Sequence, residues 1–341
     1  MSIPNSTSSK LKRRSVWVIG AAALAALSSL TWRRPAEPAR LVPLRIALPQ
    51  VPHAGLLHIA AGREYFKAHG LGVTLLPQIH GKAALAELLA GRADVAAAAD
   101  VPIVVEVLKG APLGIATTLA NAPDEMAVVA RRDRGIHSST DLQGRRVGVT
   151  FGTSGDYFLW AYMVRHRLAA QSLTLVDLPP NQLIEALGDG SVDAIAAWQP
   201  VRHGAESALG DAAASFAAPD AYAQTFNLVG SSDFLRSHGD VVHRVVLALL
   251  DAERYVRAEP LQAKRLLAAR LGIEPYALDP AWQSISLELG QRQAQLVTLE
   301  DVSSWAMTRG YAPVQPVPNF LSHIYLDALM AATPERVTVV R

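Results

Sequence analysis

The stretch IEALGDGSVDAIAAWQP, residues 184–200, has the pattern of a helix end, a glycine-containing turn, an aspartate and a short apolar strand that ends at a tryptophan. The same pattern occurs earlier, in AELLAGRADVAAAADVP, residues 86–102. When the two stretches are aligned at their glycines, Asp94 falls on Asp193, 99 residues later. A single repeat at so long a period predicts two similar halves rather than a solenoid.

The repeat extends outward from this stretch to a whole unit of alternating strands and helices. In the first half we expect strands over 44–48, 73–78, 95–99 and 113–120, and helices over 53–70, 82–90 and 101–109. In the second half we expect strands over 145–150, 173–178 and 194–198, and helices over 156–169 and 181–187. Strands that alternate with helices over short connections predict an α/β fold with parallel sheets, covered by helices on both faces.

After residue 232 the alternation stops, and the pattern predicts a mainly helical part. The expected helices cover 233–258, 260–271, 278–290, 298–309 and 320–331. Several of them must pack on the first half, because the second half contains helices of its own. The chain would then cross between the halves near 122–130 and near 220–230, and two crossings are typical of a hinge.

The first 40 residues differ from the rest. A basic segment, KLKRR at 10–14, precedes 18 residues without a charge at 15–32. Within the latter, Ala26-Leu27-Ser28 has small residues at the positions suited to cleavage after Ser28. This order is typical of an export signal. An apolar segment of that length can also stay in a bilayer as an anchor. We therefore expect export, with residues 15–32 either removed or in contact with the membrane.

Composition excludes several classes of function. The 341 residues are 50% hydrophobic and 18% charged and contain no cysteine, which excludes a cysteine nucleophile and a thiolate metal site. Beyond residue 40, 29 acidic residues exceed 25 basic ones, so we expect no nucleic-acid partner. The motifs GxSxG, HExxH and GxxxxGK[ST] are missing, and the ten histidines lack metal-ligand spacing. We expect a recognition site rather than an enzyme, with no metal or cofactor.

Ligands of open α/β sheets bind at the carboxyl ends of the strands. The predicted strand ends lie at 49–53, 78–82, 99–101, 120–121, 151–157, 179–181 and 198–200. From these loops we take as candidate ligand-binding residues Gln50, His53, Asp100, Asn121, Thr153, Ser154, Gly155, Tyr157, Trp198 and Gln199.

Most of these candidates also have a structural interpretation. Thr153 or Ser154 could cap the following helix instead of binding an anion at its N-terminus, where Asp156 could already lie. Trp198 could be a core residue or a wall of the site, and Asp100 could cap the helix that follows it. Asp94 and Asp193, at the other ends of their strands, are expected to form turns.

Four segments resemble a known family: 45–77, 84–96, DLQGRRVGVTFGTSGDYFL at 141–159, and LGDGSVDAIAAWQP at 187–200. They are similar to the sulfonate-, nitrate- and taurine-binding proteins of ABC transporters, whose superfamily includes binders of the pyrimidine precursor of thiamine. The resemblance covers about 44–235 in the same order.

The resemblance implies a periplasmic-binding-protein fold of type II, with two α/β lobes on a two-strand hinge. Lobe one would comprise 41–125 and the helical 226–341, lobe two would comprise 126–225, and 1–40 would be leader and linker. It implies a monomer, periplasmic or tethered to the inner membrane, that delivers a small anion to an ABC permease and its ATPase. A thiamine-type pyrimidine as ligand, a membrane-anchored solute sensor and, less favoured, a superfamily enzyme are the alternatives.

Overall fold

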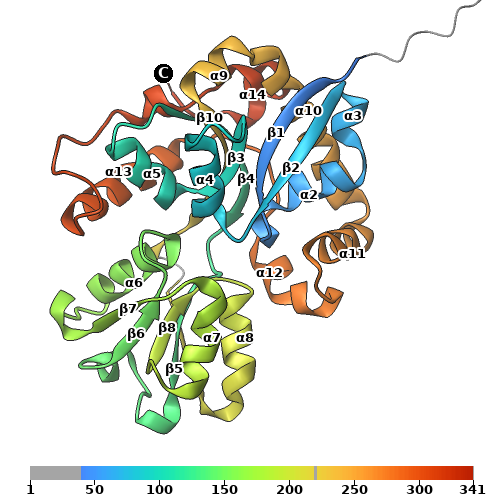
Figure 1. Ribbon diagram of the computed structural model, residues 1–341. Coiled ribbons are helices and arrows are strands. Elements are labelled where there is room, and N and C mark those ends of the chain that lie inside the picture. The colour runs from blue at the N-terminus through green and yellow to red at the C-terminus, as the bar shows by residue number, and fades with distance from the viewer. Residues whose placement is uncertain (1–39, 219–220, 341) are drawn as a thin grey trace, which may run out of the picture. The chain divides into compact units, whose positions relative to one another are not determined.

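The computed structural model describes residues 40–218 and 221–340 (Figure 1). The predicted export signal or anchor lies outside these residues. Residues 41–341 form one compact unit. Within the described part, no helix is long and apolar enough to cross a membrane.

Two five-stranded sheets confirm the repeat that the sequence indicates. The first sheet has the order β2 (Leu71–Gln78), β1 (Val42–Pro49), β3 (Val95–Ala99), β10 (Gln224–Ser231) and β4 (Leu113–Ala122). The second has the order β7 (Thr174–Asp177), β6 (Arg146–Val149), β8 (Ala194–Ala197), β5 (Ala127–Arg131) and β9 (Ala213–Ala217). In both sheets the first three strands are parallel and the fourth runs antiparallel to its neighbours.

The antiparallel strand of each sheet follows a crossing of the chain. The chain leaves the first sheet after β4 and enters the second as β5, and it leaves the second after β9 and returns as β10. The crossings therefore fall where the sequence predicts them. Strands β5, β9 and β10 were not predicted. The five-residue runs AVVAR in β5 and AASFA in β9 show no clear alternation of apolar and polar residues.

Helices cover the sheets much as expected. The first half contributes α2 (Gly55–Gly62), α3 (Tyr65–Ala68), α4 (Gly81–Leu89) and α5 (Asp100–Leu108). The second contributes α6 (Ser154–Arg165), α7 (Pro180–Asp189) and α8 (Val201–Leu209), the last of which was not predicted.

The C-terminal helices pack on the first sheet's layer, as expected. They are α9 (Ser232–Ser237), α10 (Gly239–Ala258), α11 (Pro260–Leu271), α12 (Asp279–Ser284), α13 (Gln293–Thr308) and α14 (Asp327–Ala332). Helix α10 contacts α2, α3 and α14, while α11 contacts α2 and α13 contacts α5 (Figure 1).

Several predicted helices are wrong in extent. The segment 233–258 forms two helices, α9 and α10, separated at His238, and α13 begins at Gln293 rather than at 298. The helix expected over 278–290 ends at Ser284, because Ser286 instead exchanges backbone hydrogen bonds with Asn121 at the end of β4. The helix expected over 53–70 breaks at Glu64, which has a left-handed φ of 57°. In the segment 320–331 a short 3-10 turn precedes α14, which begins at Asp327.

Candidate functional site

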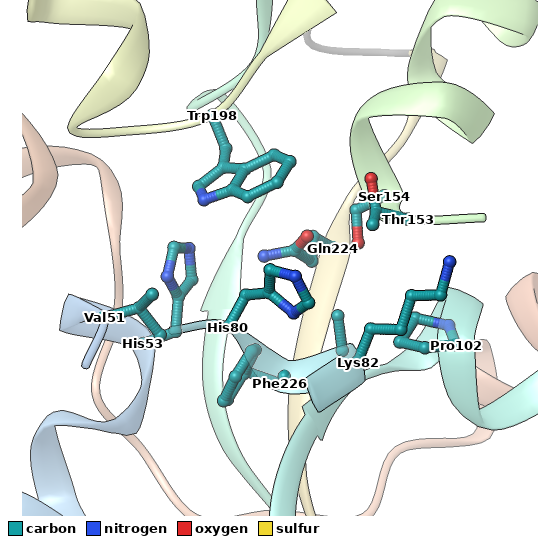
Figure 2. Close-up of a pocket in the computed structure, with 12 residues that line it drawn as sticks. Val51, His53, His80, Lys82, Pro102, Thr153, Ser154, Trp198, Gln224 and Phe226 are labelled. Carbon is teal, nitrogen blue, oxygen red and sulfur yellow. The ribbon is translucent and has the colours of Figure 1, made fainter. Parts of the chain in front are cut away.

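One cavity is lined by strand ends and helix starts of both sheets (Figure 2). The space between its walls is about 390 Å³, including the part that opens to solvent. Its walls are formed by Val51, His53, His80, Gly81, Lys82, Ala99, Pro102, Thr153, Ser154, Trp198, Gln224 and Phe226. The interior is narrow in this arrangement of the chain.

Four of the ten predicted site residues line this cavity. They are His53 after β1, Thr153 and Ser154 at the start of α6, and Trp198 after β8. A fifth, Gly155, lies behind the wall: a Cβ there would meet the Trp198 ring at 3.3 Å and the carbonyl of Ala196 at 3.2 Å. Gly155 therefore lets the start of α6 approach the end of β8.

The first residues of α6 line the cavity, with Thr153 as the N-cap and Ser154 as the first helical residue. The Thr153 hydroxyl donates to the carbonyl of Thr150 at 2.7 Å and does not cap the helix. Ser154 Oγ lies 3.4 Å from the Tyr222 hydroxyl, whose single proton is donated to Asp100. The Ser154 hydroxyl lines the cavity and can rotate to donate to a ligand. The first N–H groups of a helix have no partner within it and favour an anion.

The Asp156 carboxylate lies at the first turn of α6 but does not line the cavity. It accepts hydrogen bonds from the Gly152 N–H at 3.0 Å and from the Tyr311 hydroxyl, and Arg309 lies 3.5 Å away. Burial raises the pKa of Asp156, and these contacts offset part of that rise. Asp156 therefore ties α6 to the segment after α13, away from the cavity lining.

His80 caps α4 and presents a donor to the cavity. Its Nδ1 accepts a hydrogen bond from the backbone N–H of Ala83 at 3.0 Å. Burial, together with the nearby Lys82, lowers the pKa of His80. A neutral imidazole with Nδ1 as acceptor carries its proton on Nε2. The second helix start at the cavity thus offers an N–H group as well.

Lys82 supplies a formal positive charge at the rim. Its ammonium donates to the carbonyl of Phe151, in the second half of the chain, at 2.8 Å. The side chain is exposed, so solvent screens its charge. Two further N–H groups of the ammonium remain for a ligand.

A buried pair of ionisable groups lies behind the opposite wall. Nε2 of His53 is 2.6 Å from Oε2 of Glu125, and Oε1 of Glu125 accepts a hydrogen bond from Nε2 of Gln224 at 2.8 Å. The residues are 1%, 0% and 4% exposed, respectively. Glu125 belongs to the first crossing segment and Gln224 begins the strand after the second, so this cluster joins both crossings to the cavity wall.

Asp100 is placed close behind the wall but does not line it. Its fully buried carboxylate accepts hydrogen bonds from the Tyr222 hydroxyl, from the N–H and hydroxyl of Thr225 at 3.1 and 3.2 Å, and from the Val101 N–H at 2.8 Å. Burial raises the pKa of Asp100 to about 6. Asp100 is the first residue of α5, whose N-cap is Ala99, so its carboxylate does not cap this helix as the sequence suggested. Protein donors surround the carboxylate on the side away from the cavity lining.

The four remaining candidates do not line the cavity either. Gln50 is exposed, and Asn121 pairs through its backbone with Ser286. Tyr157 is buried against Tyr222 and two tryptophans. Gln199 accepts a hydrogen bond from the His203 N–H at 3.2 Å and lines a separate groove.

Sequence reasoning missed several residues of the wall. The loop at 78–82 was recognised as a strand end, but nothing in its pattern selected His80 or Lys82. Gln224, Phe226 and the supporting Glu125 come from the crossing segments, where no strand or motif signal identifies them.

The chemistry of the wall suits an anion. The lining contains no aspartate or glutamate, and it offers donors from His80, Lys82, Ser154 and the Trp198 indole. Two helix N-termini, those of α4 and α6, add positive partial charge from opposite sides.

Comparison with known proteins adds a family and a fold. The profile of the family described as NMT1/THI5 like matches residues 50–263. A protein of Brucella abortus, named only as a candidate binding protein, is 22% identical over 177 residues, 50% of this chain. The match spans only 54% of that relative's length.

Solved structures share the fold along nearly their whole length. The alkanesulfonate-binding protein SsuA of Xanthomonas axonopodis pv. citri, bound to MOPS, has a TM-score of 0.71 at 19% identity, over 86% of this chain and 100% of that one. The periplasmic nitrate-binding protein NrtA of Synechocystis has a TM-score of 0.69 at 11% identity, over 88% and 90%. These likenesses confirm a periplasmic-binding-protein fold.

Proposed function

The chain belongs to the NMT1/THI5-like family, and on that premise we propose that it is the solute-binding component of an ABC importer for a small anion. The observation that carries the proposal is the wall of the cavity, where two helix N-termini and four side-chain donors converge without an exposed carboxylate. The likeness in fold to sulfonate- and nitrate-binding proteins supports the same class of ligand.

Binding would draw the two sheets' loops together around the ligand. His80 and Lys82 come from the first half of the chain, and Ser154 and Trp198 from the second. A ligand that contacts both sets stabilises the arrangement in which they are close, by the difference in its affinity for the two arrangements. A permease and its ATPase would then receive the solute from this closed form.

We propose a periplasmic location, reached through the leader at 1–40. Mass spectrometry of the N-terminus of the mature protein tests whether residues 15–32 are removed or retained. A retained segment would mean tethering to the inner membrane, whereas a cytoplasmic protein with an intact N-terminus would contradict export.

Isothermal titration calorimetry with sulfonates, taurine and nitrate tests the binding half of the proposal. We expect micromolar affinity, about 8 kcal/mol, for at least one anion. Ser154→Ala should weaken binding about tenfold through loss of one hydrogen bond to a charged group. Ser207→Ala, an exposed serine on α8, is the matched control and should bind as the wild type does. Loss of uptake of the labelled anion on deletion of the gene tests transport.

A flat pyrimidine is the second candidate ligand, because aromatic rings line much of the cavity. Trp198 lies on one side and Phe226 and His53 on the other (Figure 2). Stacking on such rings would hold a neutral heterocycle. A thiamine-type pyrimidine in the same titration series distinguishes the two classes: binding of the pyrimidine and of none of the anions would replace the first proposal.

A further inference from the structure

Gln224 is held in one orientation by the buried Glu125. The amide nitrogen of Gln224 lies 2.8 Å from Oε1 of Glu125, and the other carboxylate oxygen is occupied by His53 at 2.6 Å. Each of the three side chains is at least nine-tenths buried. Solvent therefore does not compete for these bonds, and the cluster is a fixed part of the wall.

The chemistry of a carboxylate decides which end of the amide faces the ligand. The NH₂ group of Gln224 donates to Oε1 of Glu125, so the carbonyl oxygen of the same amide points away from that carboxyl group. Gln224 lines the cavity, and its amide lies between His53 and Ser154 (Figure 2). Among the described residues, the one side-chain hydrogen bond of Gln224 is the bond that its NH₂ group donates to Glu125, so none is donated to that oxygen.

The Gln224 oxygen is an acceptor, whereas the other polar groups of the wall are donors. One ligand satisfies both only if it carries an anionic group and also an N–H or O–H group. The starts of α4 and α6, with His80, Lys82 and Ser154, donate to an anionic group. A bare anion placed against the Gln224 oxygen would meet an acceptor and leave it unsatisfied, which is costly in a buried site.

We propose that Gln224 is a specificity-determining residue that selects small anions which also carry an N–H or O–H group. The anionic group lies at the two helix starts, and the donor group of the same ligand binds the Gln224 side-chain oxygen. The inference rests on the proposed anion-binding function and narrows its ligand class to hydroxy- or amino-substituted anions.

Two nearly isosteric ligands test this selectivity in the unmodified protein. Calorimetry should show that 2-hydroxyethanesulfonate binds about tenfold more tightly than propane-1-sulfonate, in which a methyl replaces the hydroxyl, since only the former satisfies the amide oxygen. Equal or tighter binding of propane-1-sulfonate overturns the role of Gln224 and leaves the proposed function intact. Absence of binding by sulfonates, taurine and nitrate alike overturns the proposed function itself.

Glu125→Gln tests the cause of the orientation. A glutamine at 125 can donate as well as accept, which frees the Gln224 amide to turn its NH₂ group into the cavity. We expect the tenfold preference to fall to about twofold or less in a variant whose circular dichroism is that of the wild type. A folded variant that keeps the full preference overturns the proposal.

Asp251→Asn is the matched control. Like Glu125, Asp251 is an acid that pairs with a histidine: its Oδ2 lies 2.7 Å from Nε2 of His69. Asp251 does not line the cavity, so Asp251→Asn makes the same acid-to-amide change away from the ligand. This variant should keep the tenfold preference, and its loss would contradict the assignment to Gln224. If Glu125→Gln does not fold, the comparison of the two ligands in the unmodified protein still decides the proposal.

Discussion

Asp193 and Arg146 exchange two hydrogen bonds: the Asp193 N–H donates to the Arg146 carbonyl at 2.8 Å, and the Asp193 carboxylate accepts from the Arg146 N–H at 2.9 Å. Asp94 and Arg45 make the same exchange in the first sheet, at 2.9 and 2.7 Å. Each aspartate thus joins the start of one strand to its parallel neighbour. The repeated Gly-Asp unit is a structural device, as the sequence indicates.

Asp193→Ala should lower the free energy of unfolding by about 1–3 kcal/mol, because the Arg146 N–H and the Arg134 guanidinium, 2.7 Å from the carboxylate, lose their acceptor. Chemical denaturation measures the change. Asp189→Ala, which removes a single exposed bond to the Ser191 N–H, is the control and should cost less than about 1 kcal/mol. Equal losses in the two variants would contradict a special role for Asp193.

Acid should weaken the protein through His58. Burial lowers the pKa of His58 from 6.5 to about 4, so the folded state binds this proton less readily than the unfolded state. Stability is then lost as the pH falls from about 6.5 towards 4. In His58→Gln, the difference in free energy of unfolding between pH 6.5 and 4.5 should shrink by about 2 kcal/mol. An unchanged difference would argue that His58 is not held neutral.

Asp100 should act in the opposite direction. Burial raises its pKa from 3.8 to about 6, although hydrogen bonds from Tyr222 and Thr225 offset part of the rise. An acid whose pKa is higher in the folded state than in the unfolded state stabilises the fold at pH values below its unfolded-state pKa. This stabilisation is lost as the pH rises towards 6. In Asp100→Asn, the free energy of unfolding at pH 6.5 should therefore exceed that at pH 4.5 by more than it does in the wild type. A smaller difference than in the wild type would contradict this sign.

Gly155→Ala should weaken ligand binding about tenfold, because the added Cβ presses on the Trp198 ring at 3.3 Å and moves it into the cavity. Gly188→Ala is the matched control: Gly188 lies in α7, and a Cβ there meets nothing within 4 Å. That change should raise the free energy of unfolding by about 0.5–1 kcal/mol and leave affinity unchanged. Calorimetry measures the affinities and thermal unfolding measures the stabilities. Undiminished affinity in Gly155→Ala would contradict the packing argument.

Two substitutions of His80 should separate capping from binding. Asparagine is a good N-cap but is too short to reach into the cavity. His80→Asn should therefore have a free energy of unfolding within about 0.5 kcal/mol of the wild-type value, and it should bind the ligand more weakly. His80→Ala should weaken binding and also cost about 1 kcal/mol of stability. Wild-type affinity in a folded His80→Asn would show that the Nε2–H group does not contact the ligand.

The alternating strands and helices were predictable because their apolar spacing is local, and the copied Gly-Asp unit relates the two halves. The predicted strand ends contain His53, Thr153, Ser154 and Trp198, which line the cavity, since parallel strands bring their carboxyl ends to one edge. Tyr157 and Asp100 lie in those same loops, yet they point into buried clusters. Position along a strand identifies the loop, but the packing of neighbouring elements decides which side chain reaches the cavity.

The sequence alone determined the two-sheet architecture, the crossings between the sheets and the structural role of Asp94 and Asp193, because these depend on patterns within a few residues of each other. Only the tertiary structure decided the polarity of the cavity. Gln224 follows Glu125 by 99 residues and His53 precedes it by 72, so no local pattern relates them. Their orientation follows from buried hydrogen bonds that form only when both crossings meet the end of β1.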